Sequence, residues 1–552
     1  MGSYRGRIDD QELRGNYRDV DPHKLSSRMC GGVHCALIHG TPVEVSLANC
    51  DIEALVQPSP DEVEAYELYL HLPDLMRLWR SPVCPTWANE SVVKPALHTL
   101  EMVFRMITSI LQDPRPYIAR DEWLRKLESL ANMEIELVSH LVEGDKKAPT
   151  TSAGSMPPAW QRVGSRPFMS RTSQTSLLSV LPNWKGVQSL RSRLLYAIEG
   201  HMMRAPFTLG LGEPNLAGKP VLEYDRICTP LEVFACRQAA PGHPEDHTLS
   251  TAHQILEAWL MVAHGLLQVI EERVKAGDPV GAAKKCWLVE RVWKLLVATM
   301  DLLQVMDPDD FMRLKHELAI NTKAQVGVNY GFEHIGGGAY CLRSNMLREV
   351  TRACKDLRHL VPKAVGVEAD PKGGPRLQEA IMELFHTHGM KTSGITTHAS
   401  VIHLLQSFQA VEVSVRQFYF SYQQLVIAVM GSGEYKGTVQ TEISAAEALS
   451  QLYFEPPYFP SLDGAKTFLG NYWHHNPDLE EGAIMRELVE TKARNMLNEQ
   501  RAPPNVQGSS SQAPERDSTM KDASRSTERQ PFVNVSLAYK QRHMQNGAMS
   551  GM

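Results

Sequence analysis

The chain has 552 residues, of which 43% are hydrophobic and 22% charged, and its formal net charge is −6. This length is enough for one to three domains with hydrophobic cores. The small net charge gives no reason to expect a nucleic acid or an anionic membrane as partner. Since the N-terminus lacks the apolar segment of a secretory signal and the longest apolar runs are too short to cross a bilayer, we expect a soluble protein of the cytoplasm, or of both cytoplasm and nucleus.

The spacing of the cysteines does not match a metal-binding motif. The nine cysteines are thinly spread, and we expect reduced thiols. Cys30 and Cys35 flank His34, but a zinc site needs about four ligands and no second pair follows nearby. We therefore expect no bound metal.

The first third of the chain divides by its apolar periodicity. Residues 1–60 show no sustained period, and we expect an irregular N-terminal arm. A helical domain is predicted over 61–143. Its helices are expected over 60–79, 90–112 and 121–144, and the second should stop before the two prolines of DPRPY.

Residues 144–183 are rich in Ser, Thr, Pro and Gly and carry no apolar period, which predicts a flexible linker. A turn-rich segment over 205–225 contains Gly210, Gly212 and Gly218. A phosphate-binding loop would need a following GK[ST] pattern, so we interpret this segment as a structural loop.

The rest of the chain is predicted to be a helical domain over 184–475. Apolar spacing indicates helices over 184–204, 251–274, 282–306, 375–388 and 398–430. The second and third should be antiparallel, because the turn between them is short. A trailing helix over 476–500 and a disordered tail over 501–552 complete the chain. Alternating strand patterns are scarce, so the predicted class is all-α.

Several segments resemble the plant HSPRO family of nematode-resistance-like proteins. They read YLHLPDLMRLW, KPALHTLEMVFRMI with DPRPY, FTLGLGEPNLAGKPVLEYD, DPKGGPRLQEA and EPPYFPSLDGAKTFLGNYW, and with the helices between them they cover roughly 64–475. The resemblance implies a stress-induced role in plant defence and basal resistance to pathogens and nematodes. It also implies signalling proteins as partners, with a regulatory subunit of an energy-sensing Ser/Thr kinase among them.

The C-terminal half also resembles the helical bundle of tryptophan 2,3-dioxygenase, a haem enzyme. The segment TAHQILEAWL is similar to that family's THQxxELW helix. The segment MDPDDFMRLKHEL resembles a turn of the dioxygenases through Met306, Asp310 and Phe311. The segment VIAVMGSGEYKGT resembles their HRVIGxxxGTGGS, with Gly431 in register. Arg343 stands where the dioxygenases hold a substrate carboxylate. The resemblance therefore makes candidates for a ligand pocket of His253, Trp259, Arg343, Gly437 and Thr438.

The position of the haem ligand departs from the dioxygenase pattern. Four residues before Gly431, where that family has the histidine that binds iron, this chain has Ile427. An isoleucine side chain has no lone pair to donate, so iron would lose its axial ligand. Tyr422 and His403 on the same predicted helix do not replace it without rearrangement. We therefore expect no cofactor and no catalytic residues.

Each candidate also has a structural interpretation. His253 is either a pocket base or a helix histidine bonded to a neighbouring helix, and Arg343 binds a carboxylate or forms a structural ion pair. The aromatic run Phe418, Tyr419, Phe420 and Tyr422 is expected mostly to fill the core. The sequence thus predicts a non-catalytic helical scaffold. The alternatives are a haem-dependent dioxygenase-like enzyme and a sensor of an amino-acid-like ligand.

Overall fold

The computed structural model describes part of the chain within the span 60–475. The described residues are 60–113, 115, 120–151, 169–179, 181, 188–215, 217–237, 242–314, 316, 340–368, 375–389, 396–430, 449–450 and 452–475. The predicted arm (apart from Pro60), the trailing helix and the tail lie outside them, as do Cys30 and Cys35. Helices dominate the described residues, which confirms the all-α class.

Four helices form from the first third of the chain. They are α3 (Pro60–Tyr69), α4 (Leu72–Arg80), α5 (Glu90–Gln112) and α6 (Arg120–Leu141). The predicted helix over 60–79 is broken in two, because His71 adopts a left-handed conformation with φ 51°. Helix α5 has the predicted bounds: its apolar stripe is continuous and Pro114 forbids its extension.

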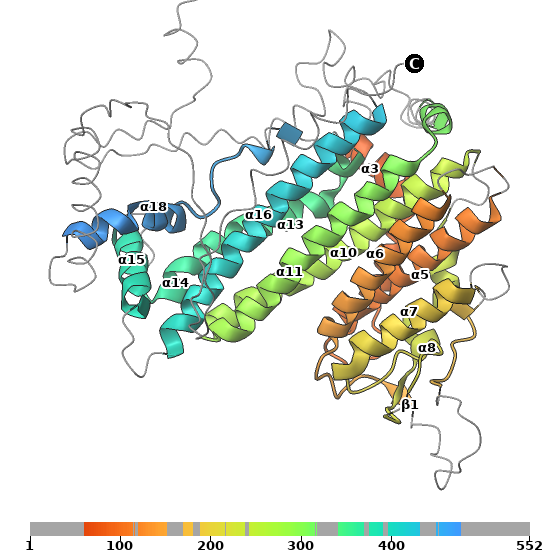
Figure 1. Ribbon diagram of the computed structural model, residues 1–552, viewed down its shortest axis with the longest axis horizontal. Helices are drawn as coiled ribbons and strands as arrows, with labels where there is room; N and C mark the ends of the chain where they lie inside the picture. The colour runs from red at the N-terminus through yellow and green to blue at the C-terminus, as the bar shows by residue number, and fades with distance from the viewer. Residues whose placement is uncertain are drawn as a thin grey trace, which may run out of the picture. The chain divides into compact units, whose positions relative to one another are not determined.

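Long helices from the two predicted domains lie side by side (Figure 1). Helices α5 and α6 come from the first predicted domain, and α7 (Gln188–His201), α10 (Pro244–Lys275), α11 (Pro279–Met300) and α16 (Thr396–Met430) come from the second. Neighbouring pairs run in the order α16, α11, α10, α5, α6. Asp278 caps α11 by accepting a hydrogen bond from the Gly281 N–H at 2.8 Å, and Gly277 has φ 76°, so the short turn sets α10 against α11.

Shorter elements complete the described part. They are α8 (Tyr224–Cys228), α9 (Pro230–Ala235), α13 (Asn345–Asp356), α14 (Val361–Val365), α15 (Pro375–Gly389) and α18 (Pro460–His475), with 3₁₀ turns η1 (Leu177–Ser179), η3 (Met202–Arg204), η4 (Asp301–Val305), η5 (Tyr340–Arg343) and η6 (Leu357–Leu360). Helix α13 packs on α10 and α16 and was not expected from the sequence. Its N-terminus is capped by Ser344, whose hydroxyl accepts from the Leu347 N–H at 2.9 Å.

Part of the predicted flexible linker is packed. Strand β1 (Thr150–Thr151) pairs antiparallel with β2 (Val221–Leu222), and Met169 and Thr172 form bridges to the turn-rich loop over 205–225. The described segment 169–179 therefore has buried residues, which corrects the expectation of a linker throughout 144–183. Its serines find partners inside the fold and are buried at Ser170, Ser173 and Ser176.

The loop over 205–225 is structural, as expected. Glu213 is buried, and its carboxylate accepts hydrogen bonds from the Gly210 N–H (3.0 Å), the Leu211 N–H (2.8 Å) and the Ser170 hydroxyl (2.8 Å). Since this internal carboxylate already takes the backbone N–H groups, they are not available to a phosphate.

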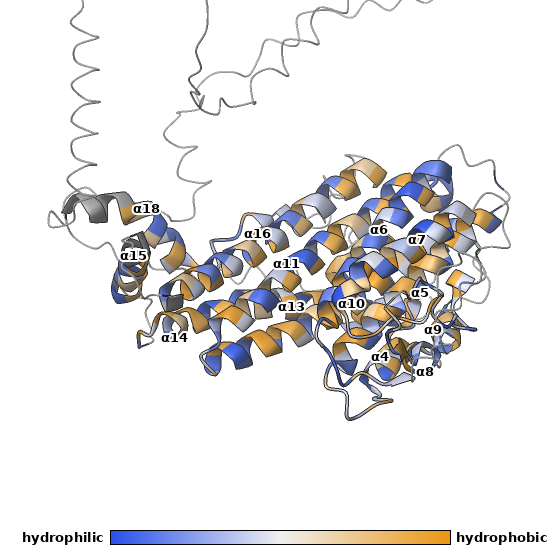
Figure 2. Cartoon of the chain, turned by 60° about the horizontal axis from the view of Figure 1, so that its bottom comes forward, coloured by the Kyte–Doolittle hydropathy of each residue, from blue (hydrophilic) through white to orange (hydrophobic). Residues whose placement is uncertain are grey.

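One hydrophobic core joins the helices of 61–143 with those of 184–475. The described residues belong to a single compact unit by their contacts, and the core includes Trp123 of α6, Trp259 of α10 and Trp293 of α11. Figure 2 shows hydrophobic and hydrophilic bands alternating along these helices, as amphipathic packing requires. No helix in the described ranges is long and apolar enough to span a membrane.

Candidate functional site

Helix α10 carries buried polar side chains where it meets α3. His253 and Glu257 lie four residues apart, hence on one face of the helix, and each is 1% exposed. The Tyr66 hydroxyl donates to Glu257 Oε1 at 2.9 Å, and the Tyr66 ring meets the His253 ring edge-on with 6.2 Å between centroids. These three residues are the centre of what we call the Glu257 cluster.

Segment η5 and helix α16 contribute further residues to the Glu257 cluster. Arg343 is buried, and its charge acts on His253. Ser344 hydrogen-bonds to Glu257, while the buried Cys341 thiol interacts with Glu257 and with Tyr422 of α16. Four segments that are distant in the sequence therefore meet at this cluster.

Burial shifts the pKa values of the titratable groups in the Glu257 cluster. Burial raises the pKa of Glu257 to about 7, although hydrogen bonds from Ser344 and Tyr66 oppose the rise. Burial and, to a smaller extent, the charge of Arg343 lower the pKa of His253 to about 4. The neutral His253 ring carries its proton on Nδ1, because the Leu249 carbonyl 2.8 Å away only accepts. A carboxyl with such a pKa can exchange a proton near neutrality.

The structure brings only some of the sequence candidates together. His253 and Arg343 both lie in the Glu257 cluster. Trp259 does not: its Nε1 donates to Glu134 Oε1 of α6 at 3.1 Å. Six helical residues separate Trp259 from His253, which turns its side chain by about 240° around α10. Gly437 and Thr438 lie outside the described residues.

Ile427, at the position of the dioxygenase iron ligand, is half-buried near the end of α16. The two residues weighed as replacements are occupied elsewhere. Tyr422 is buried and lies 6.0 Å from the Phe418 ring, while His403 stacks on Trp287 and accepts from its Nε1 at 3.2 Å. Among the described atoms, neither side chain takes the position of Ile427.

The other residues of the dioxygenase-like pattern have structural contacts. Met306 and Phe311 are buried in the core. Asp310 forms an ion pair with Arg115, with 2.6 Å between Oδ2 and Nη1. Of the aromatic run in α16, Phe418, Tyr419 and Tyr422 fill the core as expected, whereas Phe420 is 43% exposed.

Two further buried glutamates were not anticipated. Glu134 accepts from Trp259 Nε1, and burial raises its pKa to about 8. Glu101 accepts from the Tyr224 hydroxyl at 2.7 Å and the Leu177 N–H at 3.1 Å, and burial raises its pKa to about 7. The sequence contains a sign of their burial, because each glutamate interrupts an apolar stretch of its helix.

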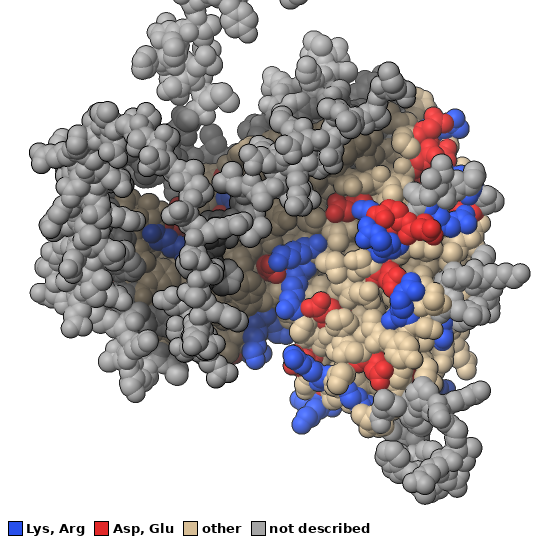
Figure 3. Space-filling model, in the orientation of Figure 1, with Lys and Arg blue, Asp and Glu red and all other residues tan. Residues whose placement is uncertain are grey.

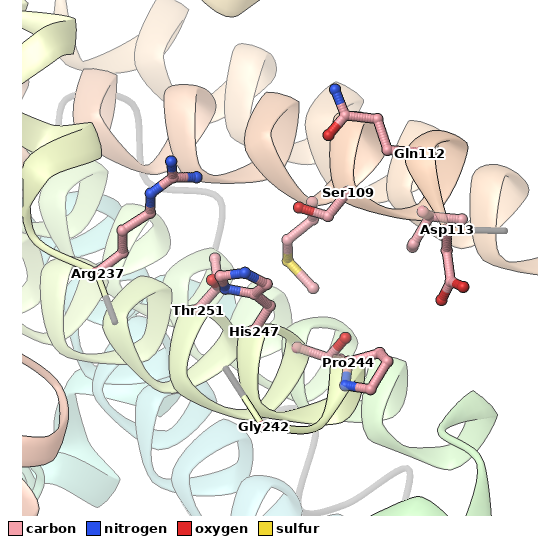
Figure 4. A pocket seen from close by; sticks show the side chains of 11 residues that line it. Ser109, Gln112, Asp113, Arg237, Gly242, Pro244, His247 and Thr251 are labelled. Atoms are coloured by element: carbon pink, nitrogen blue, oxygen red, sulfur yellow. The ribbon is translucent and has the colours of Figure 1, made fainter. Parts of the chain in front are cut away.

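A pocket of about 370 Å³ lies between the C-terminal end of α5 and the N-terminal end of α10 (Figure 4). Arg237, His247 and Thr251 lie at one end of it, and Gln112 and Asp113 lie at the other. No sequence motif had pointed to this pocket, because its residues come from three separate segments.

Metal-binding and disulfide chemistry find no support in the described ranges. No group of three or more His, Cys, Asp or Glu side chains there is arranged to hold a metal ion. The described cysteines are all buried free thiols, at Cys84, Cys228, Cys236, Cys286, Cys341 and Cys354.

Comparison with known proteins covers most of the chain. Residues 23–199 match the family model for the Hs1pro-1 N-terminus, and 202–475 match that for the Hs1pro-1 protein C-terminus. Nematode resistance protein-like HSPRO2 of Arabidopsis thaliana is 40% identical over 421 residues, which cover 76% of this chain and 89% of the relative. For HSPRO1 of the same plant the identity is 40% over 435 residues, covering 77% and 94%. The chain thus belongs to the Hs1pro-1 family of nematode-resistance-protein-like HSPRO proteins.

Proposed function

We propose that this protein is a non-catalytic regulator of plant stress and defence, nematode resistance included, that acts by binding signalling proteins. The role in defence follows from the names of its relatives. The partner proposed is a regulatory subunit of an energy-sensing Ser/Thr kinase, met in the cytoplasm or nucleus. Acidic and basic side chains are interspersed over α6, α7 and α8 (Figure 3), which suits a protein partner better than a nucleic acid.

The observation that carries this proposal is a cluster of aromatic side chains on the surface. Phe420 of α16 is 43% exposed and Phe454 is 78% exposed. Tyr453 joins them, with 5.2 Å between its ring centroid and that of Phe420 and 4.9 Å to that of Phe454. Exposed aromatic groups of this kind are typical anchors of protein interfaces. We call these three residues the aromatic cluster.

The interaction test uses purified proteins. The regulatory subunits of the kinase are titrated against this chain, and we expect binding that is at least about tenfold weaker when Phe420 and Phe454 are both replaced by Ser. Val280→Ser is the matched control, because Val280 is 51% exposed on α11 outside the aromatic cluster. Absence of binding by the unmodified protein, or equal binding by the double variant, would contradict the proposal.

The non-catalytic part of the proposal rests on Ile427. With a hydrocarbon in place of the iron ligand, and His253, Glu257 and Trp259 bonded inside the core, we expect haemin to give no stoichiometric Soret band and no turnover of tryptophan. Ile427→His restores the missing donor and serves as the positive comparison. A sharp stoichiometric Soret band and turnover in the unmodified protein would favour the haem enzyme instead.

A ligand sensor is the second candidate, and the proximity of Arg343 to His253 is the observation that favours it. A guanidinium group can bind the carboxylate of an amino acid. If this is the function, tryptophan raises the melting temperature of the protein, and Arg343→Ala abolishes that rise. An unchanged melting temperature in excess tryptophan removes this candidate.

A further inference from the structure

Arg105 of α5 is a buried cation without an anionic partner among the described residues. It is 4% exposed, and its Nη2 donates to Thr251 Oγ1 at 3.0 Å and to Gln254 Oε1 at 2.7 Å. Both acceptors are neutral. Its Nε and Nη1 are buried and lack any hydrogen-bond partner in the described structure. A charged group in this situation is unfavourable unless an anion approaches it.

Arg105 is connected through Thr251 to the pocket shown in Figure 4. Thr251, which accepts its hydrogen bond, lines that pocket together with Arg237 and His247. Burial lowers the pKa of Arg105 to about 10, with a further contribution from the charge of Arg237, so the guanidinium stays protonated at neutral pH. Burial also lowers the pKa of His247, and Arg105 and Arg237 add to this effect. The three basic groups therefore act on one another at one end of the pocket.

The acidic groups nearby offset the positive charge of this end only in part. Asp113, at the opposite end, is bound by Arg115, with 2.8 Å between Oδ2 and Nη2. Asp246 is buried next to His247 and accepts from the Tyr69 hydroxyl, and its charge raises the pKa of His247, so it offsets one positive charge at this end. Arg237 is exposed, and no carboxylate among the described residues forms an ion pair with it.

We propose that this end of the pocket binds the phosphate group of a small metabolite. Arg237 and His247 supply donors for charge-assisted hydrogen bonds to the phosphate, Thr251 supplies a hydroxyl, and Arg105, bonded to Thr251, supplies a buried positive charge. Donors from several directions suit a phosphate better than a planar carboxylate, and the pocket volume leaves room for a small organic group. This inference does not rest on the function proposed above.

The test measures binding of inorganic phosphate by the full chain. The melting temperature is followed in phosphate, in acetate and in chloride at equal ionic strength, and the dissociation constant for phosphate is measured by calorimetry. We expect a rise in melting temperature that is specific to phosphate. Equal melting temperatures in phosphate and chloride overturn the proposal, and a larger rise in acetate than in phosphate overturns the choice of phosphate.

Variants at the pocket surface locate the site without disturbing the core. Arg237→Gln and His247→Gln should each weaken phosphate binding by about tenfold or more, since each removes a charge-assisted hydrogen bond. Arg204→Gln, which changes an exposed arginine outside the pocket, should leave binding unchanged. If Arg237→Gln and Arg204→Gln bind phosphate equally well, the phosphate is bound elsewhere and the proposed site is wrong.

Discussion

At the scale of single residues, the main feature of this protein is that carboxylates are buried among neutral donors. Glu101, Glu134 and Glu257 are each 1% exposed or less, and the pKa of each is raised by burial. A carboxyl whose pKa is higher in the folded than in the unfolded chain contributes stability that is fully present below the unfolded pKa and is lost as pH rises through the folded value.

Glu134 gives the first prediction. Its pKa of about 8 means that the folded chain holds a proton there that the unfolded chain releases above its pKa near 4.5. Stability of the unmodified protein should therefore decline from about pH 5 to pH 9. Glu134→Gln keeps an acceptor for Trp259 and cannot ionise, so at pH 9 it should be more stable by roughly 2–4 kcal/mol.

Urea unfolding at several pH values measures this difference. Glu136→Gln is the control, because Glu136 lies on the same helix with a side chain that is 44% exposed. Parallel pH profiles for the unmodified protein and Glu134→Gln would show that Glu134 does not ionise differently on folding.

The glycines of the 205–225 loop give a second prediction at this scale. Gly210 has φ 84°, and a Cβ there would lie 2.8 Å from Val221 Cγ1, whereas Gly218 has φ 61° and open space around it. Gly218→Ala should lower the unfolding free energy by about 1 kcal/mol through backbone strain alone. Gly210→Ala adds a clash and should lower it by about 2–4 kcal/mol. If chemical denaturation shows that both variants lose the same unfolding free energy, the Val221 side chain moves aside without cost and the predicted clash is absent.

At the scale of elements, α10 is the helix through which the others are joined. Gln254 links it to three of them: the side-chain amide donates to the Leu70 carbonyl at 2.8 Å and the Cys236 carbonyl at 2.9 Å, and accepts from Arg105. One amide therefore connects α10 with α5, with the end of α9 and with the turn before α4.

Replacement of Gln254 by Ala leaves two carbonyl groups and one guanidinium without this partner. The unfolding free energy should fall by about 2–4 kcal/mol, as expected for buried polar groups that lose their hydrogen bonds. Gln268→Ala is the control, since Gln268 is exposed on the same helix. A loss no larger than that of the control in urea denaturation would show that water replaces the amide.

At the scale of the whole molecule, the shared core predicts cooperative unfolding. Trp123 from 61–143 and Trp259 and Trp293 from 184–475 are buried in the same core. Fluorescence and far-ultraviolet circular dichroism should report one coincident transition for the described unit. Two resolved transitions would instead indicate that the segments before and after 144–183 fold independently, as their separation in the sequence predicted.

The helices could be read from the sequence because their signals are local. Apolar spacing and the prolines after Gln112 predicted α5 with the bounds it has, and the same periodicity predicted α16 to within two residues of its termini. It also predicted α10 and α11, but α10 begins seven residues before the predicted start and α11 ends six residues before the predicted end. Helix α13 was missed, although Ser344 supplies its N-terminal cap, because its short apolar stripe has little length over which to repeat.

What the sequence determined by itself is the all-α class, the family and the isoleucine at position 427, because each depends on the order of residues along the chain. What only the tertiary structure decided is which polar side chains are buried and what they meet. His253 and Trp259 stand on one helix, yet one contacts α3 and the other α6. The sequence does not distinguish Arg105 from an exposed helical arginine, and only the structure shows that it is buried against Thr251 and Gln254 of α10. Burial depends on the neighbouring helices, and their positions are set by packing between distant segments rather than by local pattern.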